Sequence, residues 1–173
     1  MAQSKKETAN AIDLLTEDHD KVKKMFKDFE KMHENASPEE KQELAERICE
    51  ELQLHTAIEE QIFYPAAREA IDDDDLMNEA EVEHASAKDL IEQIQSMDAS
   101  DPMYDAKVTV LGEYVNHHIK EEEKEMFPEV KKAKLDLEAL GESILQMKES
   151  GSPDLAAAAR HKAGKGHRPS VRH

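Results

Sequence analysis

The sequence is poor in the residues that end helices and in those that favour β-strands. Its 173 residues include no tryptophan, four phenylalanines, three tyrosines, five glycines and six prolines, whereas charged residues make up 36%. This composition favours a helical protein with a charged surface over a β-rich one. A chain of this length is one domain's worth and can bury a hydrophobic core.

Cysteine and long apolar runs are also scarce. Cys49 is the only cysteine, so an internal disulfide is excluded and a reducing compartment is compatible with the sequence. No apolar run approaches membrane-spanning length, and the N-terminus lacks the apolar core of a signal peptide. We therefore expect a cytoplasmic protein that does not enter a membrane.

Positive charge is concentrated at the C-terminus. The formal charge is −17, but residues 151–173 hold five Lys/Arg and a single acid, which leaves about −21 on the first 150 residues. Such an acidic body repels nucleic acid and anionic membranes. The basic segment has no interleaved aromatics, so we interpret it as a solubilising tail and not as a nucleic-acid arm.

What the sequence does contain is a repeat. The segment His55-Thr-Ala-Ile-Glu59, trailed by Phe-Tyr-Pro, returns 63 residues later as His118-Ile-Lys-Glu-Glu122, trailed by Met-Phe-Pro. Residues four apart on a helix share a face, so each segment can present an imidazole and a carboxylate to one metal ion.

Two further histidines extend the repeat upstream. His19 lies 36 residues before His55, and His84 lies 34 residues before His118. The midpoints of both pairs fall in turn sequences, Ser-Pro-Glu-Glu and Asp-Pro. In an antiparallel helical hairpin, residues equidistant from the turn lie at the same height. The four histidines and the two glutamates of the repeat should therefore meet in one layer.

Apolar residues at helical spacing predict the remaining architecture. We expect an all-α protein: an up-down-up-down four-helix bundle with a short C-terminal helix, together residues 1–150, and a disordered basic tail at 151–173. The expected landmarks are a first helix from about residue 12 to 34, a capping box at Ser37 and Glu40, a kink at Pro65, an aspartate turn at 72–75, a fourth helix opening at Asp101-Pro102 and a fifth helix at 135–148.

The predicted polar layer stands where a bundle normally packs leucine and isoleucine. Burying a polar group without a partner costs about 1–3 kcal/mol, and a dinuclear metal centre removes that cost. Imidazole and carboxylate ligands without thiolate suit iron, manganese or zinc. If both glutamates bridge and each metal takes two histidines, each metal keeps an open position for oxygen, peroxide or nitric oxide. The candidate metal ligands are His19, His55, Glu59, His84, His118 and Glu122.

These residues resemble the H…HxxxE…H…HxxxE pattern of the hemerythrin-like family, specifically its bacterial HHE cation-binding type. The Phe-Tyr-Pro and Met-Phe-Pro trailers are also typical of that family, and the resemblance covers roughly residues 11–147. It implies a four-helix bundle with an oxo-bridged centre of two iron ions, in preference to manganese or zinc. Oxygen binding, redox sensing, iron handling and peroxide turnover all occur among its members.

Two departures from the oxygen-carrying hemerythrins affect the expected function. Those proteins have a His-x-x-x-His on the third helix, whereas the positions four residues either side of His84 hold Ala80 and Lys88. They also carry an Asp one residue beyond the position of Glu122, so Glu123 is a second candidate for the bridging ligand. The missing fifth histidine argues against a stable oxygen carrier and favours reactive chemistry.

The leading interpretation is a di-iron redox protein that binds or decomposes hydrogen peroxide or dioxygen, with a catalase-like activity as the enzymatic possibility. The alternative is a non-enzymatic oxygen, nitric oxide or iron binding or sensing protein. Tyr114, one turn before His118, is the candidate catalytic residue, with packing at the bundle flank as its alternative. Glu60 and Glu123 are candidates to accept hydrogen bonds from ligand imidazoles, or plain surface residues. The histidines expected to be ordinary solvated side chains are His33, His117, His161, His167 and His173.

Overall fold

The computed structural model describes residues 9–32 and 35–150, and within them the chain is helical with no strand. The helices are α1 (Ala11–Met32), α2 (Pro38–Ile58), η1 (Glu59–Phe63), α3 (Tyr64–Ala70), α4 (Asp74–Ser96), α5 (Tyr104–Glu121), η2 (Glu122–Met126), α6 (Phe127–Lys132) and α7 (Leu137–Ser150). The predicted tail at 151–173 lies outside the described residues.

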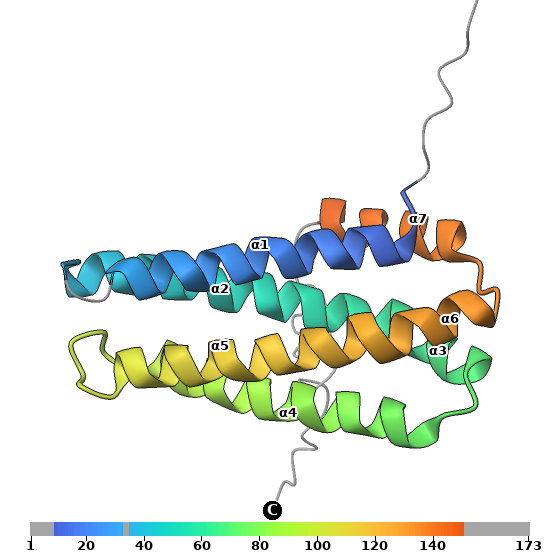
Figure 1. Ribbon diagram of the computed structural model, residues 1–173. Coiled ribbons are helices and arrows are strands. Elements are labelled where there is room, and N and C mark those ends of the chain that lie inside the picture. Colours follow the sequence, from blue (N-terminus) through green and yellow to red (C-terminus); the bar gives the residue numbers. More distant parts are fainter. Residues whose placement is uncertain (1–8, 33–34, 151–173) are drawn as a thin grey trace, which may run out of the picture.

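Four long helices form an up-down-up-down bundle (Figure 1). The second is continuous through α2, η1 and α3, and the fourth through α5, η2 and α6. The fifth, α7, lies outside the bundle against α1. The expected all-α bundle with a short C-terminal helix is confirmed.

Local signals in the sequence set most of the helix ends. Ser37 Oγ accepts from the backbone N–H of Glu40 at 3.3 Å, and Glu40 Oε2 accepts from the N–H of Ser37 at 2.9 Å, which completes the expected capping box. In the aspartate turn, Asp73 Oδ1 caps α4 by accepting from the N–H of Leu76 at 3.0 Å.

The predicted start of the fourth helix at Asp101-Pro102 is wrong by two to three residues, because α5 begins at Tyr104. Asp101 Oδ1 accepts from the N–H of Met103 at 2.8 Å, and Asp101 O accepts from the N–H of Tyr104 at 3.0 Å. These bonds close a separate turn before the helix. The fifth helix runs two residues later than expected, and the expected end of the first helix at Glu34 lies outside the described residues.

The hydrophobic core is divided into two clusters, one on each side of the polar layer. Phe29, Ile48 and Leu111 belong to the cluster nearer the turns that follow α1 and α4. Leu15 and Phe63 belong to the other cluster, which includes residues of α3, α6 and α7. The polar layer is thus closed off from water along the bundle axis.

Helix α7 docks through a close backbone approach at Gly141. A Cβ atom added at Gly141 would lie 2.1 Å from the carbonyl oxygen of Ala9, so only glycine fits there. Beside this contact, Ile144 of α7 is fully buried. The last described helix is therefore fastened to the start of the first.

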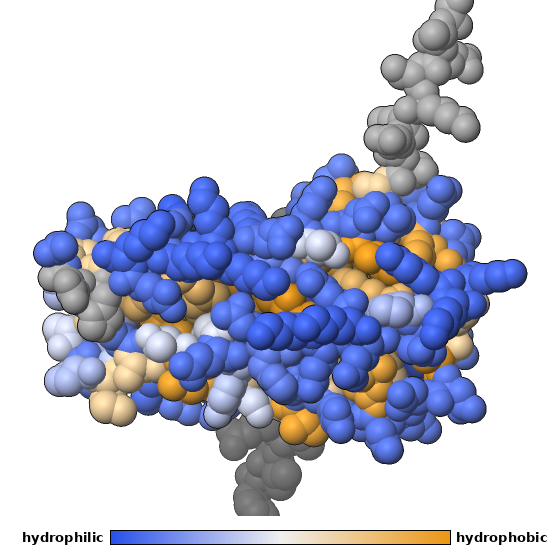
Figure 2. Space-filling view, in the orientation of Figure 1, coloured by the Kyte–Doolittle hydropathy of each residue, from blue (hydrophilic) through white to orange (hydrophobic). Residues whose placement is uncertain are grey.

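The surface is largely charged. The face in Figure 2 is mostly hydrophilic, with apolar atoms confined to small patches. No helix among the described residues is both long and apolar enough to cross a membrane.

Candidate metal centre

The six side chains predicted from the repeat meet in the middle of the bundle. Glu59 and Glu122 are 0% and 1% exposed, although both are carboxylates. The layer is built by α1, α2, η1, α4, α5 and η2, which supply His19, His55, Glu59, His84, His118 and Glu122 in that order.

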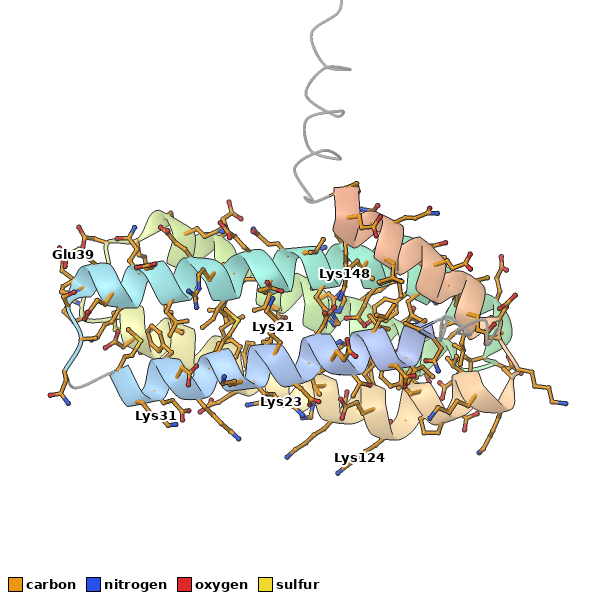
Figure 3. The ribbon with its side chains drawn as sticks, turned by 90° about the horizontal axis from the view of Figure 1, so that it is seen from above. Lys21, Lys23, Lys31, Glu39, Lys124 and Lys148 are labelled. Carbon is orange, nitrogen blue, oxygen red and sulfur yellow. The ribbon has the colours of Figure 1, made fainter. Side chains whose placement is uncertain are left out.

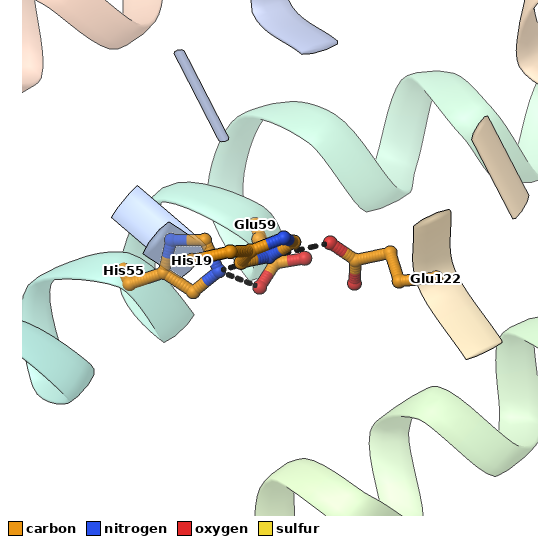
Figure 4. A group of neighbouring side chains, drawn as sticks. All are labelled: His19, His55, Glu59 and Glu122. Atoms are coloured by element: carbon orange, nitrogen blue, oxygen red, sulfur yellow. Dashed lines mark hydrogen bonds and ion pairs between the residues drawn. The ribbon is translucent and has the colours of Figure 1, made fainter. Parts of the chain in front are cut away.

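One half of the layer brings together His19, His55, Glu59 and Glu122 (Figure 4). Nε2 of His19 lies 3.2 Å from Nε2 of His55. Glu59 Oε1 is 2.6 Å from Nε2 of His55, and Glu122 Oε1 is 3.3 Å from Nε2 of His19. Two imidazoles and two carboxylates thus surround one point.

The other half repeats this arrangement with His84 and His118, whose Nε2 atoms lie 3.2 Å apart. Glu59 Oε1 is 3.5 Å from Nε2 of His84, and Glu122 Oε2 is 3.0 Å from Nε2 of His118. Each glutamate therefore lies between the two pairs of histidines, where a bridging ligand would stand.

Each of the four histidines presents its outer nitrogen to a carboxylate. A carboxylate accepts, so Nδ1 donates a proton to it, and Nε2 is the ring nitrogen that faces the layer. The Nδ1-to-oxygen distances are 2.9 Å for His19 with Glu123, 3.2 Å for His55 with Asp18, 3.2 Å for His84 with Glu60 and 2.6 Å for His118 with Glu83. Glu60 and Glu123 thus orient imidazoles, and Glu122 is the glutamate that occupies the layer.

Lysines neutralise two of these outer carboxylates. Lys148 Nζ, on α7, lies 2.5 Å from Asp18 Oδ1 and points from α7 toward the bundle (Figure 3). Lys88 Nζ lies 2.5 Å from Glu60 Oε2. Burial alone would raise the pKa of Asp18, but hydrogen bonds from His55 and Lys148 lower it below its ordinary value.

Glu83 meets a carboxyl group as well as an imidazole. Its hydrogen bond with His118 lowers the pKa of Glu83, whereas the hydrogen bond that Glu121 shares with Glu83 raises the pKa of Glu121. Negative charge is therefore crowded beside His118 on the outer side of the bundle.

The layer itself fits a pair of cations. Both oxygens of Glu59 and Oε1 of Glu122 are buried without a well-directed hydrogen bond. Two inward Nε2 atoms 3.2 Å apart also repel one another when neither of them carries a proton and no cation lies between them. A cation between these atoms removes both penalties, and the nitrogen and oxygen donors suit a transition metal.

Without a metal, protons must take the place of the cations. Burial alone would lower the pKa of His55, but the charge of Glu59 and the hydrogen bond with Asp18 raise it to about 10. Burial of His118 is likewise outweighed, by its interactions with Glu122 and Glu83, and its pKa rises to about 11. Metal binding must therefore displace protons from this layer.

Tyr64 is the residue of the layer that the sequence interpretation missed. Its hydroxyl donates to Glu122 Oε2 at 2.7 Å and lies 3.1 Å from Nε2 of both His84 and His118. Burial and the nearby carboxylates raise the pKa of Tyr64 well above its ordinary value. The two trailers carried a signal, because Tyr64 has Phe127 as its repeat mate, and Phe127 stacks on the ring of His19.

Tyr114, the predicted catalytic residue, lies at the surface. Its side chain is 50% exposed, and it lines a small pocket of about 30 Å³ together with His55, His118 and Thr56. This pocket leads from solvent to the layer. Tyr114 therefore stands along the entrance, and its catalytic role stays a prediction.

Both η segments begin at a glutamate of the layer. The N–H of Tyr64 donates to Glu59 O, and the N–H of Phe127 donates to Glu122 O, so each segment is a π turn. A proline follows each turn directly. Proline cannot donate and clashes with the carbonyl four residues back, and a π turn provides the extra room. At Pro65, where the sequence predicts a kink, the structure has this π turn, and the kink itself stays a prediction.

Comparisons with known proteins agree with this geometry. Residues 10–130 match the model of the hemerythrin HHE cation-binding domain. A hemerythrin HHE cation-binding domain-containing protein from Mycobacterium kansasii, known from a crystal structure, is 26% identical and superposes with a TM-score of 0.68 over 92% of this chain and 95% of that one.

A protein named DNA nickase from Nostoc sp. is 29% identical over 128 residues. The match covers 74% of this chain and 35% of that protein, so this chain spans about a third of that relative's length. The domain match over 121 residues and the buried layer of histidines and glutamates lead to one assignment. The chain belongs to the hemerythrin HHE cation-binding domain family.

Proposed function

We propose that the protein is a non-haem di-iron redox protein that binds or decomposes hydrogen peroxide or dioxygen in the bundle core. The observation that carries this proposal is that inward-facing histidine nitrogens lie beside buried glutamate oxygens that accept no hydrogen bond. His19 and His55 would hold one ion, His84 and His118 the other, with the two glutamates between them. Iron at these positions would supply electrons and open coordination positions to a small oxidant.

The protein side chains contribute orientation, access and a proton. The outer carboxylates fix the imidazole rings, and the two hydrophobic clusters keep water from the layer along the bundle axis. Tyr64 holds a proton on its hydroxyl oxygen within hydrogen-bond distance of Glu122, His84 and His118, so it can donate to a ligand that enters the layer. Tyr114 lines the entrance pocket that such a ligand would use.

The absent fifth histidine favours turnover over storage of dioxygen. Two positions could supply a fifth histidine. Ala80 is buried and its methyl side chain cannot bind a metal, and the ammonium group of Lys88 is paired with Glu60. The second pair of histidines therefore receives no additional imidazole. Each iron would keep an exchangeable position, which suits peroxide decomposition.

The alternative function is non-enzymatic binding or sensing of oxygen, nitric oxide or iron. The observation that favours it is the ion pair between Lys148 and Asp18, because it connects the site to α7 through His55. A change in the layer could thereby alter how α7 docks. In either case we propose a cytoplasmic protein whose ligand is small, and whose residues 151–173 take no part in the centre. The net charge of −17 argues against a nucleic-acid partner.

Reconstitution with iron and exposure to peroxide test the proposal. We expect about two iron ions per chain and oxygen evolution from hydrogen peroxide above that of the same amount of free iron. A variant with His118→Ala and Glu122→Ala should lose iron and turnover together. A long-lived oxygenated species that reverses under argon, without peroxide turnover, would assign the protein to the binding or sensing class.

A further inference from the structure

A second His-x-x-x-Glu pair lies on the fourth long helix, one residue before the pair in the layer. His117 and Glu121 directly precede His118 and Glu122, so one stretch of helix presents a pair inward and another pair outward. Nε2 of His117 lies 3.1 Å from Oε1 of Glu121, and the two side chains are 67% and 30% exposed.

Glu83 of α4 adds a third ligand atom to this outer pair. One atom each from Glu83, His117 and Glu121 lies within 4.8 Å of the others. The three line a groove between α4 and α5 that Glu79 also borders. Glu83 Oε2 accepts from Nδ1 of His118 at 2.6 Å, which holds the Glu83 side chain in place.

The equivalent place in the first repeat already contains a cation. Asp18 stands there just before His19, as Glu83 stands before His84, and the ammonium group of Lys148 lies 2.5 Å from it. The residues 63 positions before His117 and Glu121 are Leu54 and Ile58, which belong to the apolar cluster beneath α7. In this half, α7 therefore both neutralises Asp18 and covers the two apolar side chains.

The second repeat has polar groups at those same positions. Helix α7 lies along α1, on the side of the bundle away from α4 (Figure 1). The first half has Asp18 with its lysine and two apolar side chains, whereas the second has Glu83, an imidazole and another carboxylate. Glu83 also orients His118, but that contact does not explain why a second carboxylate and an imidazole converge on the same point.

We propose that Glu83, His117 and Glu121 bind a divalent transition-metal ion of the zinc or ferrous iron class, at a site separate from the layer in the core. One imidazole and two carboxylates are suitable ligands for such an ion, with water completing the coordination. The ion takes the place that the Lys148 ammonium has in the first repeat. The proposal does not depend on which metal occupies the core.

Equilibrium dialysis of the iron-loaded, full-length protein against Zn²⁺ tests this site, with iron and zinc both quantified. The variants are His117→Ala and Glu121→Gln, and the matched control is Glu113→Gln, which removes the same charge from an exposed position of α5. Removing an outer orienting group from a metal site costs about 10- to 100-fold in affinity, so loss of a direct ligand should cost at least about tenfold.

We expect the parent and the Glu113→Gln variant to bind about one zinc ion more than the His117→Ala variant, with iron content unchanged. Zinc bound by histidines of the tail cancels in this difference. If iron does not load, zinc fills the core layer as well as the outer site, and the parent still binds one zinc ion more than the His117→Ala variant. Failure of the proposed di-iron function can therefore be distinguished from failure of the outer site. Equal zinc binding by all four proteins, or zinc uptake matched by iron loss, would overturn the outer site.

Discussion

Each buried histidine is held by one ring nitrogen and presents the other to the layer. The carboxylates at Asp18, Glu60, Glu83 and Glu123 fix the four rings, so Nε2 is the atom that remains for a metal. The hydroxyl of Tyr64 joins this set through its bond to Glu122. Among the described residues, Tyr64 is the sole tyrosine hydrogen-bonded to a glutamate of the layer. Its replacement is therefore the most specific test of proton donation in the layer.

Replacement of Tyr64 by phenylalanine should slow peroxide turnover by at least about tenfold while iron content stays near two per chain, since a positioned proton donor contributes about a hundredfold or more. The repeat-related Phe127 indicates that a phenyl ring is tolerated at such a position. Steady-state oxygen evolution is the measurement. Tyr104→Phe is the control, because Tyr104 is buried in the cluster beyond the layer.

The same assay decides between the two tyrosines. Tyr114 is half exposed along the entrance, so we expect its phenylalanine variant to lose less activity than the Tyr64 variant. Equal activity of the Tyr64→Phe variant and the parent, with a slow Tyr114→Phe variant, would return the catalytic role to the residue that the sequence singled out.

At the scale of elements, the ion pair between Lys148 and Asp18 links α7 to the polar layer through His55. Lys148 and Asp18 are 26% and 14% exposed, whereas the pair formed by Lys21 and Glu51 on α1 and α2 is 57% and 30% exposed. Water screens the second pair more than the first. Loss of Lys148 also leaves Asp18 with its hydrogen bond to His55 as its remaining partner among those described.

Lys148→Met should therefore lower the free energy of unfolding by about 1–3 kcal/mol, because a largely buried carboxylate loses its counterion. Lys21→Met should cost about 0–1 kcal/mol. Urea unfolding of both variants in the same metal state is the measurement. Equal losses would mean that Lys148 does no more than a surface lysine.

The register between neighbouring helices could be predicted from sequence, because the layer residues are equidistant from each of the three turns. His19 and His55 are equidistant from the capping box at Ser37, and the second hairpin repeats the spacing, so the six layer residues could be found without a structure. The position of the Tyr64 hydroxyl in the layer could not be predicted in this way. It depends on the π turn that begins at Glu59, and a three-to-four residue periodicity assumes regular α-helix throughout.

The outer carboxylates were only partly predictable for a related reason. Glu60 and Glu123 follow the layer glutamates in both repeats, so repetition marks them. Asp18 and Glu83 sit one residue before a histidine and orient a different one on the neighbouring helix, at His55 and His118. Contacts of this kind depend on how adjacent helices rotate against each other, which spacing along one helix does not define. The start of α5 was misplaced because a local turn competed with the helix.

For the whole molecule, stability without metal should depend on pH through the protons held in the layer. In the folded protein the pKa values of His55 and His118 are raised to about 10 and about 11, against about 6.5 in an unfolded chain. A group whose pKa is raised by folding contributes its full stabilisation at pH values below its pKa in the unfolded chain. That stabilisation is lost as pH rises from about 6.5 through the folded values.

The metal-free protein should therefore melt at a higher temperature at pH 6 than at pH 9. The metal-loaded protein should lack this loss, because metal replaces the protons at Nε2, and its affinity should increase with pH over the same range. Calorimetric melting of both forms in matched buffers is the measurement. A metal-free protein that gains stability from pH 6 to pH 9 would contradict the protonated layer.

Fastening of α7 to α1 has a consequence for the order of events during synthesis. The ion pair between Lys148 and Asp18 joins residues 130 positions apart, and Gly141 meets the backbone of Ala9. Contacts so distant along the chain close late in folding. On the ribosome, the four helices that carry the layer emerge before α7 does. We expect the side of the layer beneath α7 to stay open until α7 has emerged, which gives an incoming ion a time window for loading before this helix covers the layer.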